Sequence, residues 1–214
     1  MRGTTVSHPV FARLWPHLAA AGERQGTAEL RDRLLAGAAG RVLELGAGSG
    51  TNFGHYPSAV TEVVAVEPEP RLRALAASAA LSAPVPVTIV DGDADALPAE
   101  DGAFDVAVAS LVLCSVPDQG RALAELRRVL RPGGRLLFWE HVRGEKAGLV
   151  RAQRVLDATV WPFFAGGCHT GRDTAAAIEA AGFTIERLDR FDLPDLRVNL
   201  NPASPQVLGM AVRA

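Results

Sequence analysis

Three glycines and one glutamate in the first third of the chain have the types and spacing of a nucleoside-binding site. Gly46, Gly48 and Gly50 follow an apolar run at residues 42–45, and Glu67 ends a second apolar run at residues 63–66. Glycine has no Cβ and adopts positive φ readily, so backbone at such a turn can approach a ligand closely. A carboxylate at the end of the following strand can accept hydrogen bonds from a ribose diol. The combination predicts a pocket for a nucleoside.

The glycine spacing distinguishes between cofactors. Dinucleotide-binding loops have the pattern G-x-G-x-x-G, whereas here the pattern is G-x-G-x-G and Thr51 stands where the third glycine of that loop would be. This argues against NAD. The loop resembles instead the first motif of the class I S-adenosylmethionine-dependent methyltransferases. That resemblance implies that Gly46, Gly48 and Gly50 lie against the methionine portion of S-adenosyl-L-methionine and that Glu67 binds the ribose hydroxyls.

Later segments extend the resemblance to roughly residues 40–190. Residues 91–98 resemble the adenine-binding segment, which implies that Asp93 accepts from the adenine amino group and that the Ala94 amide meets the ring; the flanking Asp91 and Asp95 are interpreted as loop acids. Residues 104–110 resemble the fourth strand, and Ser110 at its end is a further cofactor-binding candidate. Residues 126–138 resemble the helix, turn and fifth strand.

Glu44 is a candidate for a different reason. It lies between Leu43 and Leu45 on a strand predicted to be buried, and an ionised carboxylate there needs a partner. The cofactor ammonium or the amides of the glycine loop are the expected partners. Glu67, taken alone, could be a solvated acid at a strand end, and the glycine loop is what favours the ribose role.

Three strings carry a narrower likeness. LVLCSV at residues 111–116, FWEHV at 138–142 and GCHTGRD at 167–173 resemble a subgroup that includes alkyl-thiol methyltransferases. Bacterial small-molecule and phospholipid N-methyltransferases share parts of the pattern. The resemblance identifies the cofactor much better than the methyl acceptor.

The histidines are candidates for acid–base chemistry at the acceptor. His141 ends the predicted fifth strand and His169 lies in the glycine-rich loop before the last helix, so either could act as a general base near neutral pH. The alternative for both is a structural hydrogen bond. Cys114 and Cys168 are interpreted as packing residues, because nothing in the sequence pairs either with a base. No metal-ligand cluster stands out, which argues against an Mg²⁺-assisted, catechol-type enzyme.

The cofactor sets the reaction, transfer of a sulfonium methyl group to a nucleophile held in line. A thiol near pKa 8.5 is already partly ionised at neutral pH and needs little help from a base, so S-methylation of a small-molecule thiol is the favoured function. N- or O-methylation of a secondary metabolite or phospholipid head group is the alternative. A non-catalytic protein that only binds S-adenosylmethionine would carry the same motifs.

Composition restricts the partners. The net charge is -2, with 22 basic and 24 acidic residues, and this balance provides no field for a nucleic acid. Two cysteines exclude a disulfide framework and fit a reducing interior. No apolar run approaches the roughly 20 residues of a membrane span. We therefore expect a cytoplasmic protein without a membrane anchor.

Alternating helical and strand patterns predict the elements that position these residues. Helices are expected near 10–21 and 27–37, and strands near 41–45, 62–66, 86–90, 104–110, 134–140, 183–189 and 207–212. Continuous apolar runs in the middle strands indicate a parallel α/β sheet covered on both faces. The resemblance implies the order 3-2-1-4-5-7-6 with the seventh strand antiparallel. We expect one domain over 1–214, a helical cover over 1–37, and an insertion at 144–173 that lines the acceptor pocket.

Overall fold

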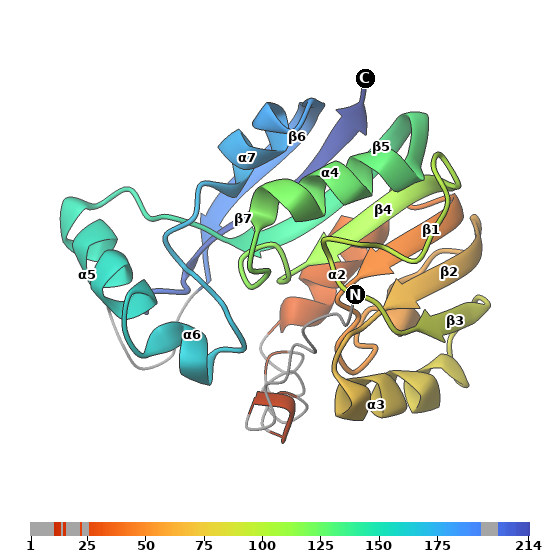
Figure 1. Cartoon of the computed structure of the whole chain (residues 1–214), viewed down its shortest axis with the longest axis horizontal. Helices are drawn as coiled ribbons and strands as arrows, with labels where there is room; N and C mark the ends of the chain where they lie inside the picture. Colours follow the sequence, from red (N-terminus) through yellow and green to blue (C-terminus); the bar gives the residue numbers. More distant parts are fainter. Residues whose placement is uncertain (1–10, 14, 16–21, 23–25, 194–200) are drawn as a thin grey trace.

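The computed structural model describes residues 11–13, 15, 22, 26–193 and 201–214, which form one seven-stranded sheet flanked by helices (Figure 1). The strand order is β3-β2-β1-β4-β5-β7-β6, as predicted. The strands are β1 (Gly40–Leu45), β2 (Val60–Val66), β3 (Val87–Val90), β4 (Phe104–Ser110), β5 (Leu130–His141), β6 (Phe183–Asp192) and β7 (Pro205–Arg213).

The first five strands are parallel, and β7 pairs antiparallel with both β5 and β6. The order reverses at β1, which lies between β2 and β4, with Glu44 opposite Ala65 on one side and Val108 on the other. Ligands of open α/β sheets bind at the carboxyl ends of the strands at such a reversal. The carboxyl end of β1, with those of β2 and β4 beside it, is therefore where a ligand is expected to bind in this fold.

The fifth strand begins earlier than predicted. Pairing starts at Leu130 opposite Phe104, shifts register, and resumes with Arg135 opposite Val106. The Pro-Gly-Gly turn at 132–134 thus interrupts the ladder rather than preceding the strand, because the residues before it already pair with β4.

Each face of the sheet packs against two helices, and neighbouring strand residues alternate between the two cores. Leu43, Ala107 and Phe138 belong to the cluster that includes helices α4 (Gln119–Val129) and α7 (Thr174–Ala180). Val42, Val106 and Trp139 belong to the cluster that includes α2 (Ala28–Leu35) and packs against α3 (Pro70–Ala80). Both faces are therefore buried, as the continuous apolar runs indicated.

The segment after β5 leaves the sheet. Helices α5 (Ala147–Asp157) and α6 (Trp161–Phe164), on the left of Figure 1, precede α7. Gln153 of α5 is fully buried; it donates to the carbonyls of residues 142, 170 and 202 and accepts from the amide of Gly144. This one side chain therefore attaches α5 to three loops.

The predicted N-terminal cover is described only in part. The helix expected at 27–37 is α2, and residues 11–13, 15 and 22 are helical. The rest of residues 1–25 lies outside the described residues. Among the described helices, none has the length and apolarity to traverse a bilayer.

Candidate active site

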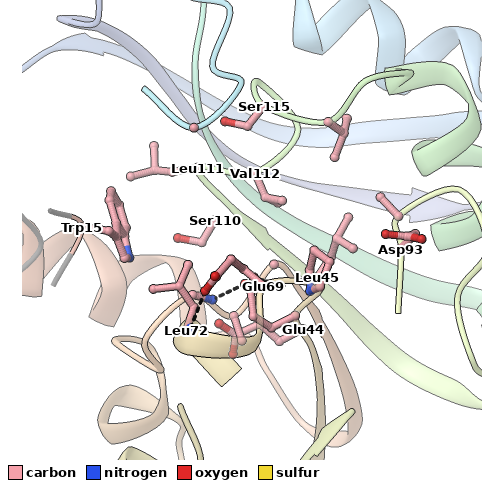
Figure 2. A pocket seen from close by; sticks show the side chains of 18 of the residues that line it. Trp15, Glu44, Leu45, Glu69, Leu72, Asp93, Ser110, Leu111, Val112 and Ser115 are labelled. Carbon is pink, nitrogen blue, oxygen red and sulfur yellow. Dashed lines mark hydrogen bonds between the residues drawn. The ribbon is translucent and has the colours of Figure 1, made fainter. Parts of the chain in front are cut away.

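A cavity of about 500 Å³ lies at the carboxyl ends of β1, β2 and β4 (Figure 2). The glycine turn after β1, Glu67 after β2, residues 93–96 after β3 and residues 110–112 at the end of β4 line it. Figure 2 shows Trp15 and Asp93 on opposite sides of this space, with Glu44 and Ser110 between them. The volume is in the range of small-molecule and cofactor sites.

The glycine turn has the backbone conformation expected of it. Gly46, Gly48 and Gly50 have φ values of +65°, +57° and +81°. A Cβ on Gly48 would lie 3.0 Å from the indole nitrogen of Trp15, and one on Gly50 would lie 2.7 Å from the Phe53 ring. The turn therefore needs glycine both for its left-handed φ and for the close approach of neighbouring side chains.

Glu67 joins the ends of the first two strands. It is 5% exposed, and its carboxylate accepts from the amide of Gly48 at 2.8 Å and from that of Glu69 at 2.9 Å. Burial raises the pKa of Glu67, and the two amides partly offset this effect. A carboxylate has about four acceptor positions, so two amides leave capacity for donors that enter the cavity.

Glu44 also lines the cavity, but its partners are side chains. Its carboxylate accepts from the side-chain amide nitrogen of Asn52 at 2.8 Å and from the hydroxyl of Tyr56 at 2.7 Å. Arg31, itself buried, donates to the side-chain oxygen Oδ1 of Asn52 at 2.6 Å. Burial raises the pKa of Glu44 to about 7. The backbone amides of the glycine turn were one of the partners expected for Glu44. That expectation was wrong among the described contacts, because the Gly48 amide donates to Glu67 instead.

The acidic segment after β3 divides between two roles. Asp93, Ala94 and Asp95 line the cavity. Asp91 instead forms an ion pair with Arg73 at 2.8 Å. Asp93 therefore borders the cavity together with Asp95, whereas Asp91 faces Arg73.

The end of β4 contains two features that indicate a ligand. The Ser110 hydroxyl is buried and has no hydrogen-bond partner in the described structure, and buried polar groups are otherwise nearly always paired. The next residue, Leu111, has φ +56°, a conformation that is costly for a branched side chain and concentrates at functional sites. Both residues line the cavity.

Glu140 holds the loop that follows Leu111. It is fully buried in β5 and accepts from the amides of Val112, Leu113 and Cys114 at 3.0, 2.8 and 3.0 Å. Burial raises the pKa of Glu140 well above its usual range. Glu140 is a functional residue that the sequence motifs do not indicate, although it shares with Glu44 the signal of a glutamate within an apolar strand.

Neither candidate histidine lines this cavity. His169 faces a second cavity of about 370 Å³, beside Arg143 and Asp157, and its Nδ1 lies 2.7 Å from the carbonyl oxygen of Gly167. His141 is packed between Cys114 and Cys168, with Nδ1 to Sγ distances of 3.6 and 3.5 Å. Both cysteines are buried, as packing residues are, but the fold places an imidazole beside them that no pattern in the sequence pairs with either. The fold also assembles a possible metal-ligating group that the sequence did not reveal.

The wall opposite Asp93 is largely apolar. Phe11 and Trp15 stack at 5.2 Å between ring centroids, and both line the cavity with Leu111, Val112 and Val116. Of the described residues in the predicted insertion at 144–173, Gly166 lines the cavity. The insertion therefore contributes less of this wall than expected, and the helical cover predicted at 1–37 contributes more, through Phe11 and Trp15.

Comparison with known proteins identifies the family. The methyltransferase domain family matches residues 43–138. Thiol S-methyltransferase TMT1B of Homo sapiens is 38% identical over 186 residues, which are 84% of this chain and 74% of that protein. The chain belongs to the class I S-adenosylmethionine-dependent methyltransferases. The Homo sapiens thiol S-methyltransferase TMT1A is 32% identical to this methyltransferase over 84% of the chain and 74% of that protein.

Solved structures agree with the fold of the methyltransferase. A putative methyltransferase from Bacillus halodurans superposes with a TM-score of 0.70 at 18% identity, covering 86% of this chain and 97% of that one. A possible histamine N-methyltransferase from Thermotoga maritima has a TM-score of 0.70 at 21% identity, covering 97% and 99%.

The cofactor of this family is S-adenosylmethionine, and the cavity fits it. Ser110 offers a buried hydroxyl without a partner, and Glu67 offers a carboxylate with acceptor capacity beyond its two amides. The glycine turn brings backbone to the cavity wall.

Proposed function

We propose that this methyltransferase transfers the methyl group of S-adenosylmethionine to the sulfur of a small apolar thiol. The observation that carries the proposal is the identity of 38% to a protein named thiol S-methyltransferase, over 84% of this chain. A relationship of this extent includes both the strands that hold the cofactor site and the segments beyond β5.

The acceptor side of the cavity supports a thiol. Its wall contains the stacked rings of Phe11 and Trp15 together with aliphatic side chains, which suit an apolar acceptor. The described lining residues include no histidine, lysine or cysteine. Of the carboxylates that line the cavity, Glu44 is bonded to Asn52 and Tyr56, and we assign Glu67 and Asp93 to the cofactor. An aliphatic hydroxyl requires a base to remove its proton, whereas a few per cent of a thiol near pKa 8.5 is already thiolate at neutral pH.

Each cofactor-binding candidate has a proposed role. Glu67 accepts from the ribose hydroxyls, and Asp93 with the Ala94 amide holds the adenine. The turn at Gly46, Gly48 and Gly50, with Glu44 behind it and Ser110 across from it, holds the methionine portion. The bound cofactor supplies an electrophilic methyl group. The protein holds the acceptor in line with that methyl and excludes water.

Other expectations remain proposals. A general-base role for His141 or His169 is a prediction from the sequence. Neither histidine is among the described residues that line the cavity, which argues against that role. A reducing, cytoplasmic location is supported by two free cysteines, and the absence of a nucleic-acid partner by the charge of -2. The helical cover at 1–37 is supported by the cavity contacts of Phe11, Trp15 and Arg31.

A matched acceptor panel tests the proposal. Purified protein is incubated with methyl-deuterated cofactor and with a thiol, an alcohol and an amine of the same carbon skeleton, and products are identified by mass spectrometry. We expect labelled thioether and an equal amount of S-adenosylhomocysteine from the thiol alone. Methylation of the alcohol or amine, with none of any alkyl or aryl thiol, would overturn the acceptor assignment.

A further inference from the structure

Cys114, His141 and Cys168 come from three separate elements and meet in one place. Cys114 lies in the loop after β4, His141 ends β5, and Cys168 follows α6. Their sulfur and nitrogen atoms all lie within 4.8 Å of one another. The cysteines are 1% and 5% exposed. Close packing alone does not require two buried thiols to face the same imidazole.

The spacing matches a soft divalent cation. With bonds of about 2.3 Å to sulfur and about 2.0 to 2.1 Å to nitrogen, adjacent sulfur and nitrogen ligands of tetrahedral Zn²⁺ lie about 3.6 Å apart. The distances from His141 Nδ1 to the two sulfurs are 3.6 and 3.5 Å. We propose that Cys114, His141 and Cys168 form a Cys₂His site for Zn²⁺ next to the cavity wall at Ser115.

The loops that carry the two cysteines are fixed in place by hydrogen bonds to their backbone groups. The Cys114 amide donates to Glu140, and the Cys114 carbonyl accepts from the amide of His169 at 2.8 Å. Arg172 donates to the carbonyls of Leu113 and Val116 at 2.6 and 2.8 Å. The ligands are therefore held together before any ion binds, which lowers the entropic cost of forming the site.

Three protein ligands leave a fourth position, as in catalytic zinc sites. Ser115, which lines the large cavity, has its hydroxyl 3.6 Å from the Cys114 sulfur, so the cluster adjoins the cavity wall there. This assignment rests on the proposed function: the fourth position would take the sulfur of the acceptor thiol. A Zn²⁺ ion held by Cys114, His141 and Cys168 would act as a Lewis acid that favours the thiolate form of the acceptor, whose proton would pass to solvent. Methyl transfer to that sulfur, with cleavage of the sulfonium–methyl bond, would leave a methyl thioether and S-adenosylhomocysteine.

The metal site is tested without any turnover. Full-length protein is stripped with a chelator under reducing conditions and titrated with Co²⁺, whose absorption reports tetrahedral geometry and thiolate ligation, and then with Zn²⁺ as competitor. We expect one ion per chain, thiolate-to-cobalt bands, and displacement by Zn²⁺. Cys114→Ser, Cys168→Ser and His141→Asn should each weaken binding more than tenfold, whereas His55→Asn, at a histidine paired with Asp32, should not.

The outcomes separate the two proposals. If the folded, reduced wild-type protein binds no Co²⁺ and shows no thiolate band, the metal site is wrong, whatever the variants do. If an alkyl thiol leaves the cobalt spectrum unchanged, the fourth-position assignment is wrong while the metal site stands. If the spectrum responds to the thiol but the Zn²⁺-loaded enzyme methylates none, the site stands and the proposed function fails.

Discussion

Glu44, Glu67 and Glu140 are three buried carboxylates whose hydrogen-bond donors differ. Glu140 accepts from three backbone amides of one loop, so its capacity is used in holding that loop. Glu44 accepts from two side chains. Glu67 accepts from two amides and borders the cavity. Of the three, Glu67 therefore combines fixed orientation with acceptor capacity toward a ligand.

Replacing Glu67 should weaken cofactor binding more than it weakens the fold. If the carboxylate accepts two charge-assisted hydrogen bonds from the ribose, Glu67→Ala should cost about 2 to 4 kcal/mol of binding free energy, measured by calorimetry with S-adenosylmethionine. Glu62→Ala is the control, because that glutamate is also on β2 but pairs with Arg41 at the surface. Equal affinities for Glu67→Ala and wild type would remove Glu67 from the site.

Two glycine substitutions separate the cost of left-handed backbone strain from the effect of a side chain that approaches the cofactor. Gly48→Val adds a side chain beside Trp15 at φ +57°, whereas Gly133→Val adds one at φ +72° with nothing within 4 Å. Both should lose stability, by about 1 to 2 kcal/mol for the left-handed conformation. Only Gly48→Val should also lose cofactor affinity, by more than tenfold. Equal cofactor affinities of the two variants would show that the turn does not approach the ligand.

At the scale of elements, α5 depends on one polar side chain rather than on an apolar face. Val155 is 63% exposed, while Gln153 is fully buried. Gln153→Ala should therefore leave several buried backbone groups unpaired, at about 1 to 3 kcal/mol for each group that water cannot reach. Hydrogen exchange across residues 147–157 should accelerate in this variant. It should not accelerate in the control Arg151→Ala, because the Arg151 side chain is exposed. Unchanged protection in Gln153→Ala would show that other contacts hold the helix.

The elements themselves were largely predictable, and the reason is physical. Strands buried on both faces require continuous apolar runs, so β1, β2 and β4 are visible in the sequence, and Gly46, Gly48 and Gly50 identify the turn. The meeting of His141 with Cys114 and Cys168 was not predictable, since it depends on how three loops converge. Partners such as Asn52 and Tyr56 for Glu44 carry no local pattern. Phe11 and Trp15 resemble any apolar helix face until the cavity is known.

For the whole molecule, Glu44 couples stability to pH. Its pKa rises from 4.5 to about 7 on folding, so the folded state keeps a proton that the unfolded chain releases between those values. The contribution of Glu44 is full below pH 4.5 and falls by about 3 kcal/mol as the pH rises to about 7.

Urea unfolding of wild type and Glu44→Gln at pH 5 and pH 8 measures this term. The wild type should lose more stability between the two pH values than the variant, since other titrating groups cancel in the comparison. Parallel pH dependence in the two proteins would mean that Glu44 has the same pKa folded and unfolded.

The place of β7 between β5 and β6 has a consequence for how the chain is made. β6 precedes β7 in the sequence but bonds to the sheet only through it. During synthesis the edge of β5 that contains Phe138 and Trp139 therefore stays unpaired until residues 205–213 have left the ribosome. Unpaired edges are where nascent chains associate wrongly. Of the seven strands, the one that comes latest in the sequence thus closes the sheet.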